Sequence, residues 1–208
     1  MSPQPDTSKQ HSPANDCTPN PLSASPSKFE YSQEERDFLV RLAHESIVSE
    51  LEGREPNVGA VPERLKETRG AFTTLYLDGE VRGCVGFVYA AAPLYQTILE
   101  TARAAAFQDT RFLPVTTEEA ERLQVVINIL SPLTTIRPEE IEIGTHGLLV
   151  SLGTARGLLL PEVATEHGWD PVTFLEHTCH KAGLPRDAWQ HGAKLEAFTA
   201  ETFGERSH

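Results

Sequence analysis

The sequence predicts an α+β fold in which antiparallel strands pack with helices. Three observations lead to this prediction: a two-residue turn signal at Asp78-Gly79, helical segments with capping signals, and strands that do not alternate strictly with helices. Strict alternation would instead indicate a doubly wound parallel sheet. The chain has 208 residues, of which 39% are hydrophobic, and this is enough to form the core of one domain or of two small lobes.

Residues 1–28 differ in composition from the rest of the chain. They hold six of the 15 prolines, six serines and four charges that cancel. Such a stretch cannot bury enough apolar area to offset its ordering entropy, so we expect a disordered tail with an exposed thiol at Cys17. The net charge of -12 then belongs to residues 29–208, the expected folded domain.

The folded part is expected to begin with a helix and a hairpin. Ser32 and Glu35 form a capping box before an apolar stripe of helical spacing, and Gly53 ends that helix. Residues 53–70 are expected to be an irregular connection. Segments 71–77 and 80–88 are strand-like and flank Asp78-Gly79, which suits a type I′ turn.

The hairpin register predicts that Leu77 pairs with Glu80 and Thr73 with Cys84. Each strand then divides between two faces. We expect the bulkier face to point into the main core, and this face comprises Phe72, Tyr76, Val81, Val85 and Phe87. The other face, which we expect to point towards a second layer or a cleft, comprises Thr73, Leu75, Arg82 and Cys84.

The remaining segments alternate irregularly between the two types of structure. Periodicity, capping signals, Gly and Pro indicate their limits. The expected elements are a helix over 94–107, a short helix from Thr116, a central strand over 123–130, a hairpin of 148–152 with 157–160, a helix from Pro161 to Gly168, a helix from Asp170 to Gly183, and a last strand over 195–202.

Charge and motif content exclude several classes of protein. An acidic surface repels phosphates, so we expect no direct nucleic-acid binding, and no apolar run is long enough to span a membrane. The first residues lack the apolar core of a secretory signal, which makes the cytoplasm the expected location. No nucleotide-binding, zinc-protease or hydrolase motif occurs, and three scattered cysteines cannot hold an iron–sulfur cluster, so no cofactor is expected.

Four ordered blocks of sequence resemble the AMMECR domain family, also called AmmeMemoRadiSam system protein A. The blocks are Val-Arg-Gly-Cys-Val-Gly at 81–86, Gln-Asp-Thr-Arg-Phe-Leu-Pro-Val at 108–115, Glu-Ile-Gly-Thr-His-Gly-Leu at 142–148, and Leu-Leu-Leu-Pro-Glu-Val-Ala at 158–164, followed by Gly168-Trp169 and Lys181-Ala182-Gly183. The resemblance covers residues 30–204. It implies a two-lobed α+β domain, mostly antiparallel sheet with packed helices and a cleft between the lobes. It also implies two partners, a Memo-type protein and a radical S-adenosylmethionine (SAM) enzyme.

Cys84 is the main candidate for a catalytic residue. Arg82 lies two residues away on the predicted face, and a nearby guanidinium favours a reactive thiolate. His146, in a glycine-flanked turn, and Glu162 are the candidate bases. Gly83 and Gly86 could let a ligand approach the backbone, or could simply allow a helix to pack closely.

Two further groups of residues have both a functional and a structural interpretation. Arg111 and Asp109 could bind an anionic ligand, or could pair with each other and fix their loop. Glu162 could equally be stabilised by the helix dipole as the second residue of its helix. Glu176, His177, Cys179 and His180 suggest a metal, but Cys179 falls on the apolar stripe, so we expect no metal site.

Three functional hypotheses follow. The preferred one is a ligand- or partner-binding accessory module that uses Arg82, Arg111 and the 83–86 backbone. The alternative is a cysteine-dependent transferase or thiol redox enzyme that uses Cys84. A nucleic-acid-modifying role would require a partner to bring the substrate, because of the acidic charge.

Overall fold

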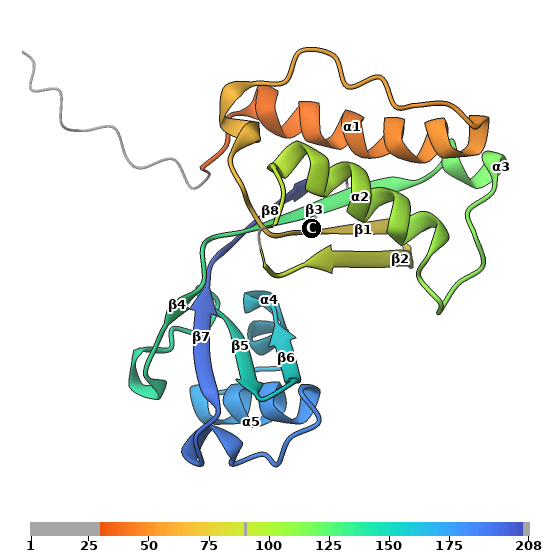
Figure 1. Ribbon diagram of the computed structural model, residues 1–208. Coiled ribbons are helices and arrows are strands. Elements are labelled where there is room, and N and C mark those ends of the chain that lie inside the picture. The colour runs from red at the N-terminus through yellow and green to blue at the C-terminus, as the bar shows by residue number, and fades with distance from the viewer. Residues whose placement is uncertain (1–29, 90, 206–208) are drawn as a thin grey trace, which may run out of the picture. The chain divides into compact units, whose positions relative to one another are not determined.

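A computed structural model describes residues 30–89 and 91–205 of the chain (Figure 1). The expected tail, including Cys17, lies outside these residues. From Tyr31 onwards the chain forms one compact unit. Among the described helices, none combines the length and the apolar character needed to cross a lipid bilayer.

The chain folds into two antiparallel sheets with helices, which confirms the α+β prediction. The helices are α1 (Gln33–Glu52), α2 (Leu94–Phe107), α3 (Thr117–Ala120), α4 (Pro161–Glu166) and α5 (Pro171–Lys181). The strands are β1 (Ala71–Leu77), β2 (Glu80–Phe87), β3 (Gln124–Leu130), β4 (Thr134–Thr135), β5 (Gly147–Leu152), β6 (Ala155–Leu159), β7 (Lys194–Phe198) and β8 (Ala200–Gly204). Short 3₁₀ turns occur at Glu63–Lys66, Pro138–Glu140 and Ala188–Gln190.

The first lobe contains the sheet with strand order β2-β1-β3-β8 and the helices α1 and α2, which cover one of its faces (Figure 1). The predicted capping box is present, since the Ser32 hydroxyl accepts the Glu35 N–H and the Glu35 carboxylate accepts the Ser32 N–H. Leu39 and Ile47 of α1 and Ile98 of α2 are completely or almost completely buried in this core. The helices therefore pack through the apolar stripes that their spacing predicts.

The β1–β2 hairpin has the predicted turn, but its register shifts part of the way along. Asp78 and Gly79 both have positive φ, as a type I′ turn requires, and Leu77 pairs with Glu80. A bulge then leaves Arg82 without a partner residue, so that Cys84 pairs with Thr74. The predicted pairing of Cys84 with Thr73 is wrong because a bulge inserts one extra residue into one strand.

The predicted faces of β1 are reversed, because α2 covers the side on which Thr73 and Leu75 lie. The Thr73 hydroxyl lies 2.8 Å from that of Thr101 on α2, and Leu75 is fully buried on the same side. Phe72 and Tyr76 therefore lie on the face away from α2, and Cys84 shares that face because residues paired across a sheet lie on the same side. The assignment of Phe72 and Tyr76 to the main core is therefore wrong, and so is that of Thr73 and Leu75 to the opposite face. Val81 and Phe87, also expected in this core, are 40% and 38% exposed. Val85 packs against the core and Cys84 faces away from it, as predicted.

The second lobe contains the sheet with strand order β4-β7-β5-β6 and packs α5 against one face. The predicted hairpin is present as β5 and β6, with Val150 paired to Gly157. A Cβ on Gly157 would lie 2.3 Å from the Ala182 nitrogen, so α5 can approach β6 this closely only because residue 157 is glycine. Phe174 and Cys179 are fully buried in this core, and Cys179 thus points inward as predicted.

Two strand connections join the lobes. The chain passes from β3 to β4 and from β7 to β8, so the predicted last strand over 195–202 is divided between the two sheets at Thr199. The Ser131 N–H donates to the Thr199 carbonyl at 2.9 Å, and the Thr199 N–H donates to the Ser131 Oγ at 2.9 Å. These bonds hold the two connections together at the junction.

Candidate functional site

Cys84 lies on the edge strand β2 and is half-buried. The Thr74 hydroxyl donates to its Sγ across the strand pair at 3.2 Å. On the outer edge of the strand, the Cys84 N–H donates to Oδ2 of Asp109 at 2.9 Å. The 108–115 loop thus supplies an acceptor to a backbone group that would otherwise lack a partner strand.

Asp109 and Arg111 form a bidentate ion pair. The Arg111 Nε and Nη2 donate to the Asp109 carboxylate at 2.9 and 2.6 Å. These bonds hold the pKa of the Asp109 carboxyl well below its usual range, and the Cys84 N–H contributes in the same direction. The same hydrogen bonds raise the pKa of Arg111. The Arg111 guanidinium and the Cys84 N–H thus share the Asp109 carboxylate.

Arg82 binds a different carboxylate. Its Nε and Nη2 donate to the two oxygens of Glu119 at 3.0 Å each, and Nη2 also reaches the Pro114 carbonyl at 3.4 Å. Bonds from Arg82, and then from the Thr116 N–H, lower the pKa of Glu119. Among the described residues, the hydrogen-bond partners of the Arg82 side chain lie in α3 and the 108–115 loop, and Cys84 is not one of them.

Two arginines thus hold the loop between α2 and α3. The Phe112 ring contacts both of them, with its centroid 5.9 Å from the Arg82 Cζ and 5.3 Å from the Arg111 Cζ. The Val115 N–H donates to the Ala106 carbonyl at 2.9 Å. Leu113, in the middle of this loop, is nevertheless 82% exposed.

The glycines of the 81–86 block have packing roles. A Cβ on Gly83 would lie 2.1 Å from the Ala105 carbonyl oxygen of α2, and a Cβ on Gly86 would lie 2.2 Å from the Phe72 ring. Gly83 therefore lets α2 lie directly against β2, which is the structural alternative for this residue. The Gly86 backbone also lines a cavity, so its candidate role in ligand binding stays open.

The candidate base Glu162 lies at the start of α4 and contacts the first lobe. Its Oε1 accepts the Thr202 hydroxyl at 2.8 Å, and the Thr202 Oγ1 lies 2.6 Å from Oδ1 of Asn128. The Oε2 of Glu162 is buried without a hydrogen-bond partner in the described structure. Thr202 is on β8, and Cys84 is on β2, three strands away in the same sheet. At a strand spacing of about 4.8 Å, the two strands are roughly 14 Å apart. Glu162, which binds Thr202, is therefore well beyond hydrogen-bond reach of Cys84.

The other candidate base, His146, belongs to the second lobe. Its Nδ1 accepts the Glu142 N–H at 3.1 Å within its own turn. None of the described hydrogen bonds connects it or Glu162 with Cys84. The structure therefore brings Cys84, Asp109 and Arg111 together and leaves the two candidate bases elsewhere.

Two cavities are lined by residues of both lobes, and Val88 and Tyr89 line both of them. One has a volume of about 520 Å³ and extends from Gly86 to Leu158 of β6. The other, of about 350 Å³, extends from Arg69 to Glu196 of β7. Both cavities lie where the two lobes meet, the place where the family resemblance implies a cleft.

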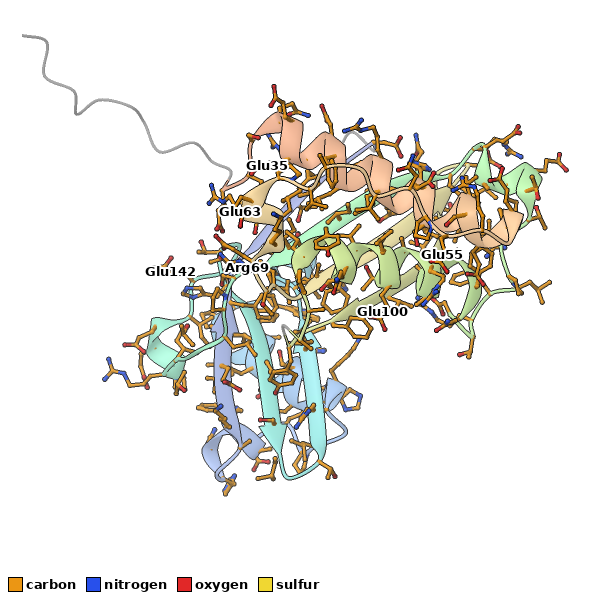
Figure 2. The ribbon with its side chains drawn as sticks, turned by 45° about the horizontal axis from the view of Figure 1, so that its top comes forward. Glu35, Glu55, Glu63, Arg69, Glu100 and Glu142 are labelled. Carbon is orange, nitrogen blue, oxygen red and sulfur yellow. The ribbon has the colours of Figure 1, made fainter. Side chains whose placement is uncertain are left out.

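The acidic side chains that would oppose binding of anionic polymers occur on both lobes. Figure 2 labels Glu35, Glu55 and Glu100 of the first lobe and Glu142, which precedes β5.

In the described part of the chain, no three histidine, cysteine or carboxylate side chains gather at metal-binding distance. His177 instead stacks on the Trp169 ring at a centroid distance of 3.9 Å.

Sequence reasoning missed several residues that the structure places at these sites. Thr74 was assigned no role because the predicted register opposed Cys84 with Thr73. Glu119 was recognised as a capping residue, and the Thr116–Glu119 capping box is present, but its second partner Arg82 is 37 residues away along the chain. Tyr89 and Arg156 carry no motif, and only the meeting of the lobes brings them to one cavity.

Comparison with known proteins shows several clear matches. The AMMECR1 family model matches residues 40–203. A protein of Aquifex aeolicus is 41% identical, with 81% of this chain and 91% of that protein covered. Protein MJ0810 of Methanocaldococcus jannaschii is 42% identical, covering 83% and 90%. The crystal structure of the uncharacterized protein PH0010 from Pyrococcus horikoshii matches with a TM-score of 0.79 and 39% identity, covering 86% of this chain and 95% of that one.

Proposed function

We propose, starting from the fact that this chain belongs to the AMMECR1 family, that it is a partner-binding accessory component. The partners are a Memo-type protein and a radical SAM enzyme, the pair that the sequence resemblance implies. The protein works with them in the cytoplasm, where its cysteines remain thiols. The 108–115 loop supplies the docking residue.

The observation that carries this proposal is the exposure of Leu113 on a loop that is held in place at several points. Single exposed leucines are common and need no explanation. Here, however, a buried carboxylate at Asp109 and the 13%-exposed side chain of Arg82 hold the loop on both sides of Leu113. A loop fixed in this way loses little entropy when a partner covers it, and this favours affinity.

In this proposal, the sequence blocks at 81–86 and 108–115 together form the docking surface. Arg82 donates to the Pro114 carbonyl, and the Cys84 backbone donates to Asp109. Val81, next to Arg82, is itself 40% exposed. The β2 edge supports the loop, and the apolar side chains of Leu113 and Val81 contact the partner.

The proposal is tested by measuring binding of the Memo-type and radical SAM proteins from the same genome to wild type and variants. Leu113→Asp should weaken binding about 30-fold, the effect of losing a central apolar contact of about 2 kcal/mol. Val172→Asp, at a 50%-exposed residue of α5, is the matched control and should bind as wild type does.

Two more variants separate the loop from the thiol. Arg82→Ala should weaken binding because it releases Pro114 and Glu119, whereas Cys84→Ser should keep it. Equal binding by wild type, Leu113→Asp and Arg82→Ala would refute the proposal.

One observation favours a second candidate, a cysteine-dependent enzyme. The Thr74 hydroxyl donates to the Cys84 sulfur, and the Arg111 guanidinium binds the same Asp109 carboxylate as the Cys84 N–H. A nucleophilic cysteine requires such an environment. The pH dependence of Cys84 alkylation tests this candidate: reaction only above about pH 8.5, the usual thiol pKa, would argue against activation.

A further inference from the structure

The cavity of about 520 Å³ between β2 and β6 has the size of a small-molecule site. Most of its walls are apolar. The apolar lining residues are Phe87, Val88, Tyr89, Ala92, Leu149 and Leu158.

The cavity has a physical origin in the second sheet. Gly157 faces α5, as its contact with the Ala182 nitrogen shows. Its neighbours along β6, Arg156 and Leu158, therefore face the other way. Leu158 pairs with Leu149 of β5, so both leucines lie on the face that α5 leaves uncovered, and this face forms one wall of the cavity.

One cation lies at this cavity. The Arg156 Cζ is 5.1 Å from the centroid of the Tyr89 ring, a cation–π contact between the two lobes. Among the described residues, no carboxylate lies within ion-pair distance of Arg156. Arg82 and Arg111, by contrast, each bind a carboxylate of the chain itself.

Glu100 of α2, labelled in Figure 2, is the one acidic residue among those that line the cavity. It also borders a neighbouring cavity that contains Arg103. A carboxylate on this wall disfavours a ligand with several negative groups. The lining therefore suits a molecule with one anionic end and an apolar body.

We propose that this cavity binds small amphipathic carboxylates, with the acyl or aromatic body between Phe87, Leu149 and Leu158 and the carboxylate paired with Arg156. A guanidinium binds a carboxylate through two parallel hydrogen bonds. The Tyr89 ring holds the guanidinium in place before the ligand arrives. This site is separate from the Leu113 docking loop, and the two proposals can fail independently.

Isothermal titration calorimetry of the full chain with octanoate at pH 7 tests the proposal. Octanoate should bind saturably, and hexanoate about 15-fold more weakly, because each buried CH₂ contributes about a fourfold change in affinity. Octylamine should bind at least tenfold more weakly than octanoate. Methyl-labelled NMR spectra should show octanoate contacts with Leu149 and Leu158.

Variants locate the site. Arg156→Gln should weaken octanoate binding about tenfold and leave 1-octanol binding unchanged, whereas Ala92→Phe should weaken both by filling the cavity. Arg186→Gln, at an exposed arginine of the same lobe, is the matched control, and Leu113→Asp should bind octanoate as wild type does. The absence of saturable binding, equal binding of octylamine, or an unchanged octanoate affinity in Arg156→Gln would overturn the proposal.

Discussion

Gly83→Ala tests directly whether the glycine of the 81–86 block serves the packing of α2. The added Cβ would lie 2.1 Å from the Ala105 carbonyl oxygen and 3.0 Å from its carbon, and neither backbone atom can rotate away. Helix α2 would have to move by about 1 Å, although it packs against α1 and the sheet. Overpacking of this kind costs about 1–3 kcal/mol, and a backbone clash belongs at the upper end of that range.

The net loss of stability should be about 2 kcal/mol, because the alanine also reduces the entropy of the unfolded chain by an equivalent of about 0.4–1 kcal/mol. For a domain of this size, the Tm should fall by about 4–8 °C. Thermal unfolding followed by circular dichroism measures this change. Cys84→Ala, at the adjacent residue on the opposite face, is the control for a general effect on β2, and a Tm of Gly83→Ala equal to that of wild type would refute the packing argument.

Three further predictions concern the ion pairs and the cores. Asp109→Asn should lower stability by about 1–3 kcal/mol, since the carboxylate accepts from both Arg111 and the Cys84 N–H. Because folding lowers the pKa of Asp109, its carboxylate stabilises the fold at neutral pH, and this stabilisation is lost progressively as the pH falls below about 4. In urea titrations between pH 6 and 2.5, the free energy of unfolding should therefore fall less steeply with pH in Asp109→Asn than in wild type. Parallel curves for the two proteins would contradict this. Glu119→Gln should increase hydrogen exchange in residues 112–115 while leaving α5 unchanged, and equal exchange rates would contradict the bracing role of Arg82. Phe174→Ala should destabilise the second lobe by about 3–5 kcal/mol, measured by urea unfolding, and a smaller change would show that the site collapses around the cavity.

The arginine pairs also explain why one expectation about the site changes. We expected Arg82 to influence Cys84 because the two residues are two positions apart on one strand face. The bulge at Arg82 breaks this alternation, and Glu119 binds the guanidinium instead. Arg111, a candidate anion-binding residue with an internal pair as its alternative, binds Asp109, and Asp109 also accepts the Cys84 N–H.

The sequence alone determined the elements whose causes are local. Ser32 with Glu35, Thr116 with Glu119, and Asp78-Gly79 each specify a cap or a turn through contacts within four residues, and all three are present. The apolar spacing of α1 and α2 identifies the faces that they bury. Local geometry suffices in these cases because hydrogen bonding and side-chain periodicity act within one or two helical turns.

Only the tertiary structure decided which distant residues meet. The bulge in β2 changes the register of the hairpin, so that Thr74 rather than Thr73 lies opposite Cys84. The amino-acid sequence of the strand does not reveal this bulge. The Arg82–Glu119 pair, the Glu162–Thr202 contact and the cavity bounded by Tyr89 and Arg156 each join segments 37 or more residues apart in sequence. The packing of both lobes sets these contacts, because a side chain binds the partner that the folded backbone places within its reach.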